Sequence, residues 1–177
     1  MKKNIAVFCS ASGDINPEFN KVAREFVRAA SLRGYGIVSG GTIKGTMGEI
    51  SDEIRNCGGY HLGVIPRFME EYVYPHLDDV IWTDTMAERK TLLRKATVAV
   101  VALPGGVGTL DEFIETVALV HLKKYDGKLV LLNHEGFYEP LRDLLKHYLN
   151  TKMMSQSTFD KIVFASSAAE ALEYIGD

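Results

Sequence analysis

A glycine-rich segment, Pro104-Gly105-Gly106-Val107-Gly108-Thr109, has the composition of an anion-binding turn. It follows an apolar run and precedes a stretch with helical spacing, so its backbone N–H groups and the start of the helix would point to one place. Glycine permits positive φ and lets a ligand approach the backbone closely, and Thr109 adds a hydroxyl. We therefore expect this turn to bind a phosphate.

The spacing of this turn excludes two common nucleotide motifs. No lysine follows the glycines, as a Walker A loop requires, and the pattern is not the GxGxxG of dinucleotide-binding proteins. A purely structural interpretation stays open, because Thr109-x-x-Glu112 also fits a helix capping box. The two interpretations agree on Thr109 and compete for Glu112, which is either a cap that accepts a backbone N–H or a free carboxylate.

Two other segments carry residues that could contact a ligand. Four glycines lie in the nine residues 40–48, which indicates close approach of the backbone to a ligand, although a flexible structural loop would look similar. The second segment is Met86-Ala87-Glu88-Arg89-Lys90. Adjacent basic residues on a helix are usually solvated, and for Arg94 and Lys95 no role is expected.

The composition sets the class of protein. The chain has 177 residues, 46% hydrophobic and 24% charged, which predicts one globular domain over residues 1–177. A net charge of −3 argues against a nucleic acid polymer as partner. No run approaches the roughly 20 apolar residues of a membrane span, and the five histidines have no metal-ligand spacing. Cys9 and Cys57 also lack it, which favours a reduced, cytoplasmic protein with no metal.

The elements that must position these residues alternate between short apolar runs and longer amphipathic ones. This alternation predicts a doubly wound, mostly parallel, Rossmann-like sheet in a three-layer α/β/α arrangement. Ligands of such sheets bind beyond the carboxyl ends of the strands, where we expect the turns 9–13, 39–42 and 104–109 to meet. The expected strands are 5–9, 35–38, 61–65, 80–82, 97–103, 128–132 and 162–165, and the expected helices are 17–33, 48–56, 85–95, 109–122, 137–149 and 167–175.

Taken together, two motifs resemble a known family. Met86, Arg89 and Lys90, followed by Pro-Gly-Gly-x-Gly-Thr-x-x-Glu at 104–112, are similar to the signature of the LONELY GUY (LOG) proteins. These are cytokinin riboside 5′-monophosphate phosphoribohydrolases, formerly labelled "possible lysine decarboxylase". The resemblance covers nearly the whole chain and includes residues 7–10, 40–48, 63–66 and 131–141.

The resemblance implies hydrolysis of the N-glycosidic bond of a nucleoside 5′-monophosphate, such as AMP or N6-prenylated AMP, to a free base and ribose 5-phosphate. By position, Arg89 and Glu112 match the catalytic pair of the family. A carboxylate suits this reaction, because it can stabilise an oxocarbenium-like centre and orient the attacking water. The family also implies a homodimer and no cofactor. The residues expected to bind substrate are Glu71, Lys90, Gly105, Gly106, Val107, Gly108, Thr109, Leu110, Asp111, Ser10, Gly40, Gly41 and Met86.

Three departures from the family pattern limit the resemblance, and the last two leave the choice of nucleobase and a preference for prenylated adenine open. They are Thr42 in place of a glycine, Ala118-Leu119-Val120-His121, and Gly127-Lys128. Two other functions also stay open. A non-catalytic carrier of a nucleotide or of the molybdenum cofactor would not need the pair Arg89 and Glu112. A decarboxylase would need pyridoxal phosphate on a lysine, and Lys90 is the lysine nearest to a motif.

Overall fold

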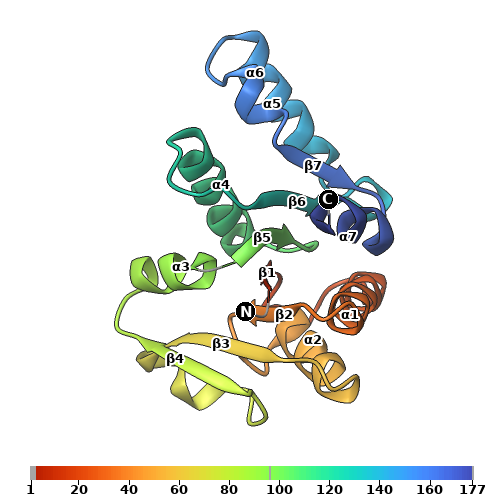
Figure 1. The fold of residues 1–177 in the computed structure, drawn as a ribbon, viewed down its shortest axis with the longest axis vertical. Coiled ribbons are helices and arrows are strands. Elements are labelled where there is room, and N and C mark those ends of the chain that lie inside the picture. Colours follow the sequence, from red (N-terminus) through yellow and green to blue (C-terminus); the bar gives the residue numbers. More distant parts are fainter. Residues whose placement is uncertain (1–2, 96, 177) are drawn as a thin grey trace.

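A computed structural model describes residues 3–95 and 97–176, which are built around a seven-stranded β-sheet (Figure 1). All neighbouring strands pair in parallel, so the predicted "mostly parallel" sheet is entirely parallel. In spatial order, the strands are β4 (Asp79–Thr83), β3 (His61–Pro66), β2 (Gly36–Ser39), β1 (Asn4–Phe8), β5 (Thr97–Ala102), β6 (Lys128–Leu132) and β7 (Ile162–Ala165).

Helices cover both faces of the sheet, as the alternating sequence pattern predicted. Successive side chains of a strand point to opposite faces, so Ile5 and Val7 of β1 lie in one buried cluster while Ala6 and Phe8 lie in the other. One face is covered by α1 (Pro17–Leu32), α2 (Gly45–Asn56) and α7 (Ala168–Gly176), the other by α3 (Met86–Arg94), α4 (Val107–His121) and α5 (Glu139–Asn150). Within the described residues, no helix is both long and apolar enough to cross a membrane.

The chain connections place a crevice between β1 and β5. From β1 the chain moves outward through β2, β3 and β4, then returns to the other side of β1 as β5 and continues to β6 and β7. The connections after β1 and β5 therefore leave the sheet in opposite directions. This leaves a crevice at the carboxyl ends of the two strands, where doubly wound folds bind ligands. The turn after β1 and the turn before α4 meet there.

Element boundaries differ from the predictions chiefly at helix starts. Helix α2 begins at Gly45, three residues before the predicted start, and α4 begins at Val107, two residues before it. Glycines lie at both starts, and glycine is a poor helix former, so the sequence pattern placed the starts too late. Three short helices were not predicted: η1 (Arg67–Tyr72), η2 (His134–Gly136) and α6 (Gln156–Phe159).

A buried polar pair joins β2 to β3 beneath the turn at 39–42. Ser39 Oγ and His61 Nε2 share a hydrogen bond of 2.7 Å, and the N–H of Gly41 donates to the same Oγ at 3.1 Å. His61 is 2% exposed. Burial lowers the pKa of its imidazole to about 4, against a smaller opposite effect of the Asp78 carboxylate, so the folded protein holds this ring neutral.

We predict that this histidine makes the protein less stable in mild acid. In the unfolded chain His61 takes up a proton below about pH 6.5. In the folded protein the same imidazole stays neutral down to about pH 4. The free energy of unfolding should therefore fall by about 3 kcal/mol across this window through His61 alone. Urea unfolding of the wild type and of His61→Gln between pH 7 and 4 measures the difference. The exposed His147→Gln is the control and should keep the wild-type pH slope; an unchanged slope in His61→Gln would contradict the prediction.

Candidate active site

A cavity of about 330 Å³ opens at the carboxyl edge of the sheet, beside the crevice between β1 and β5. This volume is in the range of small-molecule sites. Its wall is formed by the turn after β1, the first turns of α4, one face of α3, and side chains from α2 and η1. The lining residues are Cys9, Ser10, Ala11, Ser12, Met47, Met69, Met86, Arg89, Gly106, Gly108, Thr109, Asp111 and Glu112.

A buried ion pair forms the centre of this cavity. Arg89 Nη1 donates to Glu112 Oε1 at 2.7 Å, and the two side chains are 7% and 12% exposed. The Nε of Arg89 donates to the carbonyl of Val64 at 3.1 Å. The guanidinium therefore ties α3 to α4 and to β3. The structure thus brings the two predicted catalytic residues together in one cavity.

The capping interpretation of Glu112 is wrong, because α4 starts earlier than the capping box requires. Its N-cap is Gly106, with no side-chain hydrogen bond, and Glu112 lies in the second turn of the helix. There its carboxylate faces Arg89. Burial raises the pKa of Glu112, and the charge and hydrogen bond of Arg89 offset only part of that effect. A carboxylate with a raised pKa is a better proton acceptor, which suits a general base.

The glycine-rich turn presents open backbone to the cavity. Gly106 and Gly108 line it, and nothing lies within 4 Å of a Cβ built at either residue. None of the three glycines of this turn has positive φ, so close access explains them better than backbone strain. A Cβ at Gly105 would overlap the side chain of Thr109, which is buried behind the turn. The start of α4 adds its free N–H groups, so the turn has the features of an anion site.

The second glycine-rich loop, residues 40–48, leaves space for the side chain of Arg89. Gly40 and Gly41 do not line the cavity. A Cβ on Gly40 would overlap Nη2 of Arg89 and lie 2.7 Å from Sδ of Met47, while Gly41 has φ of +62° and packs against Gly63. The close backbone approach predicted for this loop is therefore an approach to the arginine and to β3.

Lys90 lies outside the cavity lining, in a network of charges between α3 and α4. Its Nζ contacts Asp111 Oδ2 at 3.0 Å and also Glu115, whose other oxygen accepts from Arg94 at 2.7 Å. The hydrogen bonds that Lys90 donates to Glu115 and Asp111 raise its pKa. A lysine that forms an imine must lose its proton, so this environment disfavours a pyridoxal phosphate site. Arg94, for which no role was expected, is buried in this network.

Besides Lys90, Gly40, Gly41 and Gly105, which do not line the cavity, three predicted binding residues lie away from it. Glu71 is exposed on η1, Val107 is 84% exposed, and Leu110 is 40% exposed on another side of α4. Five lining residues were not predicted: Cys9, Ala11, Ser12, Met47 and Met69. Cys9 and Ser12 could have been found, because they follow β1 at the edge where the ligand turns meet. The two methionines belong to α2 and η1, and no local pattern marks them.

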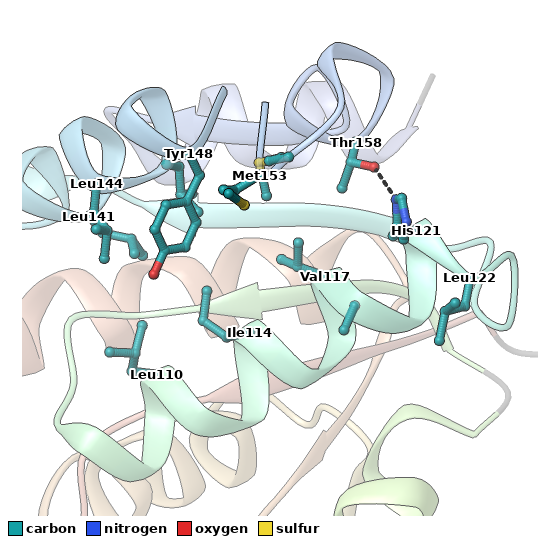
Figure 2. A pocket seen from close by; sticks show the side chains of 13 residues that line it. Leu110, Ile114, Val117, His121, Leu122, Leu141, Leu144, Tyr148, Met153 and Thr158 are labelled. Atoms are coloured by element: carbon teal, nitrogen blue, oxygen red, sulfur yellow. Dashed lines mark hydrogen bonds between the residues drawn. The ribbon is translucent and has the colours of Figure 1, made fainter. Parts of the chain in front are cut away.

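An apolar groove of about 420 Å³ lies beside the cavity, between α4 and α5. Figure 2 shows Leu110 and Ile114 of α4 across from Leu144 and Tyr148 of α5, with His121 hydrogen-bonded to Thr158 at the far end. Six large apolar side chains here are more than a third exposed: Leu110, Ile114, Leu122, Leu144, Tyr148 and Met153.

Comparison with known proteins gives consistent names. A family model described as "possible lysine decarboxylase" matches residues 47–175. The chain is 34% identical over 170 residues to the cytokinin riboside 5′-monophosphate phosphoribohydrolase of Mycobacterium tuberculosis, which covers 95% of this chain and 90% of the relative. It is 32% identical over 177 residues to the LOG1 phosphoribohydrolase of Arabidopsis thaliana, covering 99% and 83%.

Among solved structures, the molybdenum cofactor carrier protein of Chlamydomonas reinhardtii shares the fold. The TM-score is 0.76 with 22% identity, and the match covers 99% of this chain and 97% of that chain. The molybdenum cofactor binding protein of Rippkaea orientalis matches equally well, with a TM-score of 0.76 and 23% identity over 99% and 96%. At this identity the likeness concerns the fold alone.

We predict that Gly40→Ala destabilises the protein through Arg89. The added methyl group meets a guanidinium that Val64 and Glu112 hold in place, so the variant should lose about 1–3 kcal/mol of unfolding free energy. Urea unfolding measures the loss. Gly13→Ala is the matched control, because nothing lies within 4 Å of its Cβ, and its change should stay within about 0.5 kcal/mol. Equal stability of the two variants would show that Arg89 does not need the space at Gly40.

Proposed function

The chain belongs to the LONELY GUY family, whose model is described as "possible lysine decarboxylase", and from this premise we propose that it hydrolyses the N-glycosidic bond of a nucleoside 5′-monophosphate. AMP or N6-prenylated AMP is the substrate, and the products are a free base and ribose 5-phosphate. One observation carries the proposal: the buried ion pair of Arg89 and Glu112 shares its cavity with the glycine-rich turn. The names of the relatives support it.

The 5′-phosphate binds at the turn, where Gly106, Gly108 and the first N–H groups of α4 face the cavity. The N–H groups at a helix start are not used within the helix, and the helix dipole favours an anion there. Glu112 lies three to five residues further along α4, which is about 5–7 Å along the axis. A bound ribose spans this interval and brings C1′ to the carboxylate.

The reaction then needs only groups that this cavity supplies. Glu112 orients a water and accepts its proton as the water oxygen bonds to C1′ and the C1′–N bond breaks. The departing base takes up one proton from solvent and Glu112 returns its proton to solvent, so the net reaction adds one water across the C1′–N bond and regenerates the carboxylate. Arg89 holds the carboxylate through Oε1, and the fixed guanidinium thereby sets the orientation of the other carboxylate oxygen, Oε2, which is left to act on the water and the sugar. Positive charge that develops on the sugar is stabilised by the carboxylate.

A carrier of nucleotides or of the molybdenum cofactor is the main alternative. The solved structures of molybdenum cofactor carrier and binding proteins are 20–23% identical to this chain and support the fold alone. A carrier that only binds its ligand would not need the buried carboxylate of Glu112, whose burial costs free energy. Cys9 and Cys57 are free thiols, which supports the cytoplasmic location that we propose.

We predict that the purified protein releases free base from AMP and that Glu112→Gln lowers the rate at least about 100-fold. Glutamine keeps the shape of the side chain and still accepts a hydrogen bond from Arg89, but it cannot take a proton from water. Chromatographic assay of free base with AMP, N6-prenylated AMP and other nucleoside monophosphates measures turnover.

The matched control is Glu88→Gln on the exposed side of α3, which removes one charge outside the cavity. It should keep wild-type turnover. Full activity in Glu112→Gln would exclude Glu112 as the base. Absence of base release from every nucleotide by the wild type would reject the enzyme and favour the carrier.

We also propose that two copies of the chain form a homodimer through the apolar groove between α4 and α5. Contiguous exposed apolar surface is uncommon on monomers, and two-fold dimers are the commonest oligomers. Leu110 and Ile114 of this groove flank Asp111 and Glu112 in sequence. A second copy seated here would therefore lie next to the cavity.

We predict that Leu144→Glu converts the dimer to a monomer, because it places a charge among the apolar side chains of the interface. Light scattering coupled to size-exclusion chromatography measures the mass. Leu32→Glu is the control: Leu32 is 72% exposed at the end of α1, outside the groove, and its variant should stay dimeric. A monomeric wild type, or a dimeric Leu144→Glu protein, would reject this interface.

A further inference from the structure

The glycine-rich turn needs support from outside itself to keep one shape. Nothing lies within 4 Å of a Cβ built at Gly106 or Gly108, so this backbone is open to a ligand. Glycine loses more conformational freedom on ordering than any other residue. A turn that became ordered only when the ligand arrived would therefore bind it weakly. The contacts that fix the entry of the turn from β5 consequently bear on binding.

The turn begins where β5 leaves the sheet. Ala102 is the last residue of β5 in the strand registers, where it lies opposite Phe8 of β1 and Leu131 of β6. The carbonyl of Leu103 comes after this paired part of the strand, and Leu103 is 0% exposed. A buried carbonyl without a hydrogen bond costs free energy, so this oxygen needs a donor.

The hydroxyl of Tyr138 supplies this hydrogen bond. It donates to the carbonyl of Leu103 at 2.6 Å, and Tyr138 is 6% exposed. Burial raises the pKa of Tyr138, and the neighbouring Cys9 raises it further, so the phenol keeps its proton and remains a donor. Cys9 lines the cavity at the end of β1. Tyr138 therefore lies next to the point where the turn after β1 and the glycine-rich turn meet.

The position of Tyr138 is itself fixed by hydrogen bonds. Tyr138 directly precedes α5, and its N–H donates to Asn133 Oδ1 at 2.7 Å. The side-chain amide of Asn133 donates to Glu139 Oε1 at 2.6 Å, and the backbone N–H of Asn133 donates to the carbonyl of Ala165 at 2.7 Å. A chain of hydrogen bonds therefore runs from the ends of β6 and β7 to the peptide that enters the turn.

This hydrogen bond sets the direction in which the turn leaves β5. A peptide unit is planar, so a fixed Leu103 oxygen fixes the plane that leads into Pro104. The proline ring restricts φ of Pro104, which leaves ψ of Pro104 as the first free rotation before the glycines. At the next residue, a Cβ on Gly105 would overlap the buried side chain of Thr109. The turn is thus held by Tyr138 at its entry and lies against Thr109 behind it.

We propose that Tyr138 is a positioning residue for the phosphate site, because its hydroxyl holds the peptide that enters the glycine-rich turn. This inference rests on the proposed function, since it takes the turn to bind the 5′-phosphate. Tyr138 does not line the cavity, so it acts through the backbone and not by contact with the ligand. Loss of its hydroxyl weakens the binding of ligands that carry a phosphate and spares the contacts to the rest of the nucleotide.

Tyr138→Phe tests this role, because it removes the hydrogen bond and keeps the ring. Calorimetric titration in the Glu112→Gln background compares ribose 5-phosphate, which carries the phosphate, with adenosine, which lacks it. Binding of ribose 5-phosphate should weaken about 5- to 20-fold, while that of adenosine should stay within about twofold. In the protein that carries Glu112, KM for AMP should rise by a similar factor while kcat stays within about threefold.

Tyr74→Phe is the matched control. Tyr74 is also 6% exposed and donates one hydrogen bond, to Asp52 of α2 at 2.7 Å, and it does not line the cavity. Its variant loses a tyrosine hydrogen bond of similar burial and should bind both ligands as before. Asn133→Ala loosens Tyr138 but keeps the hydroxyl, so it should weaken ribose 5-phosphate selectively and by a smaller factor. This variant decides the question if Tyr138→Phe does not fold.

The outcomes separate the role of Tyr138 from the proposed reaction. Equal weakening of ribose 5-phosphate and adenosine, or a Tyr138→Phe protein that behaves like Tyr74→Phe, would overturn the positioning role even if the protein hydrolyses AMP. Selective weakening of ribose 5-phosphate in a protein that never releases base from AMP would reject the reaction and support the positioning role. A parent protein that does not bind ribose 5-phosphate would overturn both the phosphate site and the role of Tyr138.

Discussion

The ion pair between Arg89 and Glu112 is the interaction on which the rest of the site depends. It connects α3 with α4, and through the carbonyl of Val64 it connects both to β3. Removal of one partner would leave an unpaired charge in a nearly closed environment, which typically costs about 3–5 kcal/mol. Position 40 must be small for this pair to form, because the guanidinium of Arg89 occupies the space that a side chain at Gly40 would fill.

Stability alone does not explain a buried pair of this kind. A pair of apolar side chains of similar volume would often serve stability as well or better, and burial already raises the pKa of Glu112 despite its partner. The fold thus holds a carboxylate where its charged form is disfavoured, and a carboxylate held in this way is a stronger base than one in water. The neighbouring network of Lys90, Arg94 and Glu115 differs, since it lies outside the cavity lining and braces the same two helices.

The sequence predicted the architecture because the architecture depends on local patterns. Apolar runs and amphipathic stretches define the strands and helices, and the handedness of the connections leaves few arrangements of a parallel sheet. The place of the glycine-rich turn between β5 and α4 could be predicted for the same reason, since its glycines lie within four residues. The sequence could not show whether Glu112 caps α4, because the contact that its carboxylate makes instead is with Arg89, 23 positions earlier. The glycine at position 40 likewise indicates that something lies close to the backbone there. The sequence does not show that this neighbour is Nη2 of Arg89.

Helix α4 joins two surfaces that sequence motifs treat separately. Its first turns carry the end of the glycine-rich turn and Glu112, and its side facing α5 carries Leu110, Ile114 and Val117 of the apolar groove. A rigid helix transmits displacement from one side to the other, so a partner that covers the groove also restrains the carboxylate. Glu112 is already fixed on its other side by Arg89. Helix α4 would then take part in both assembly and catalysis. The exposed groove and the buried ion pair are separated by less than two turns of this helix.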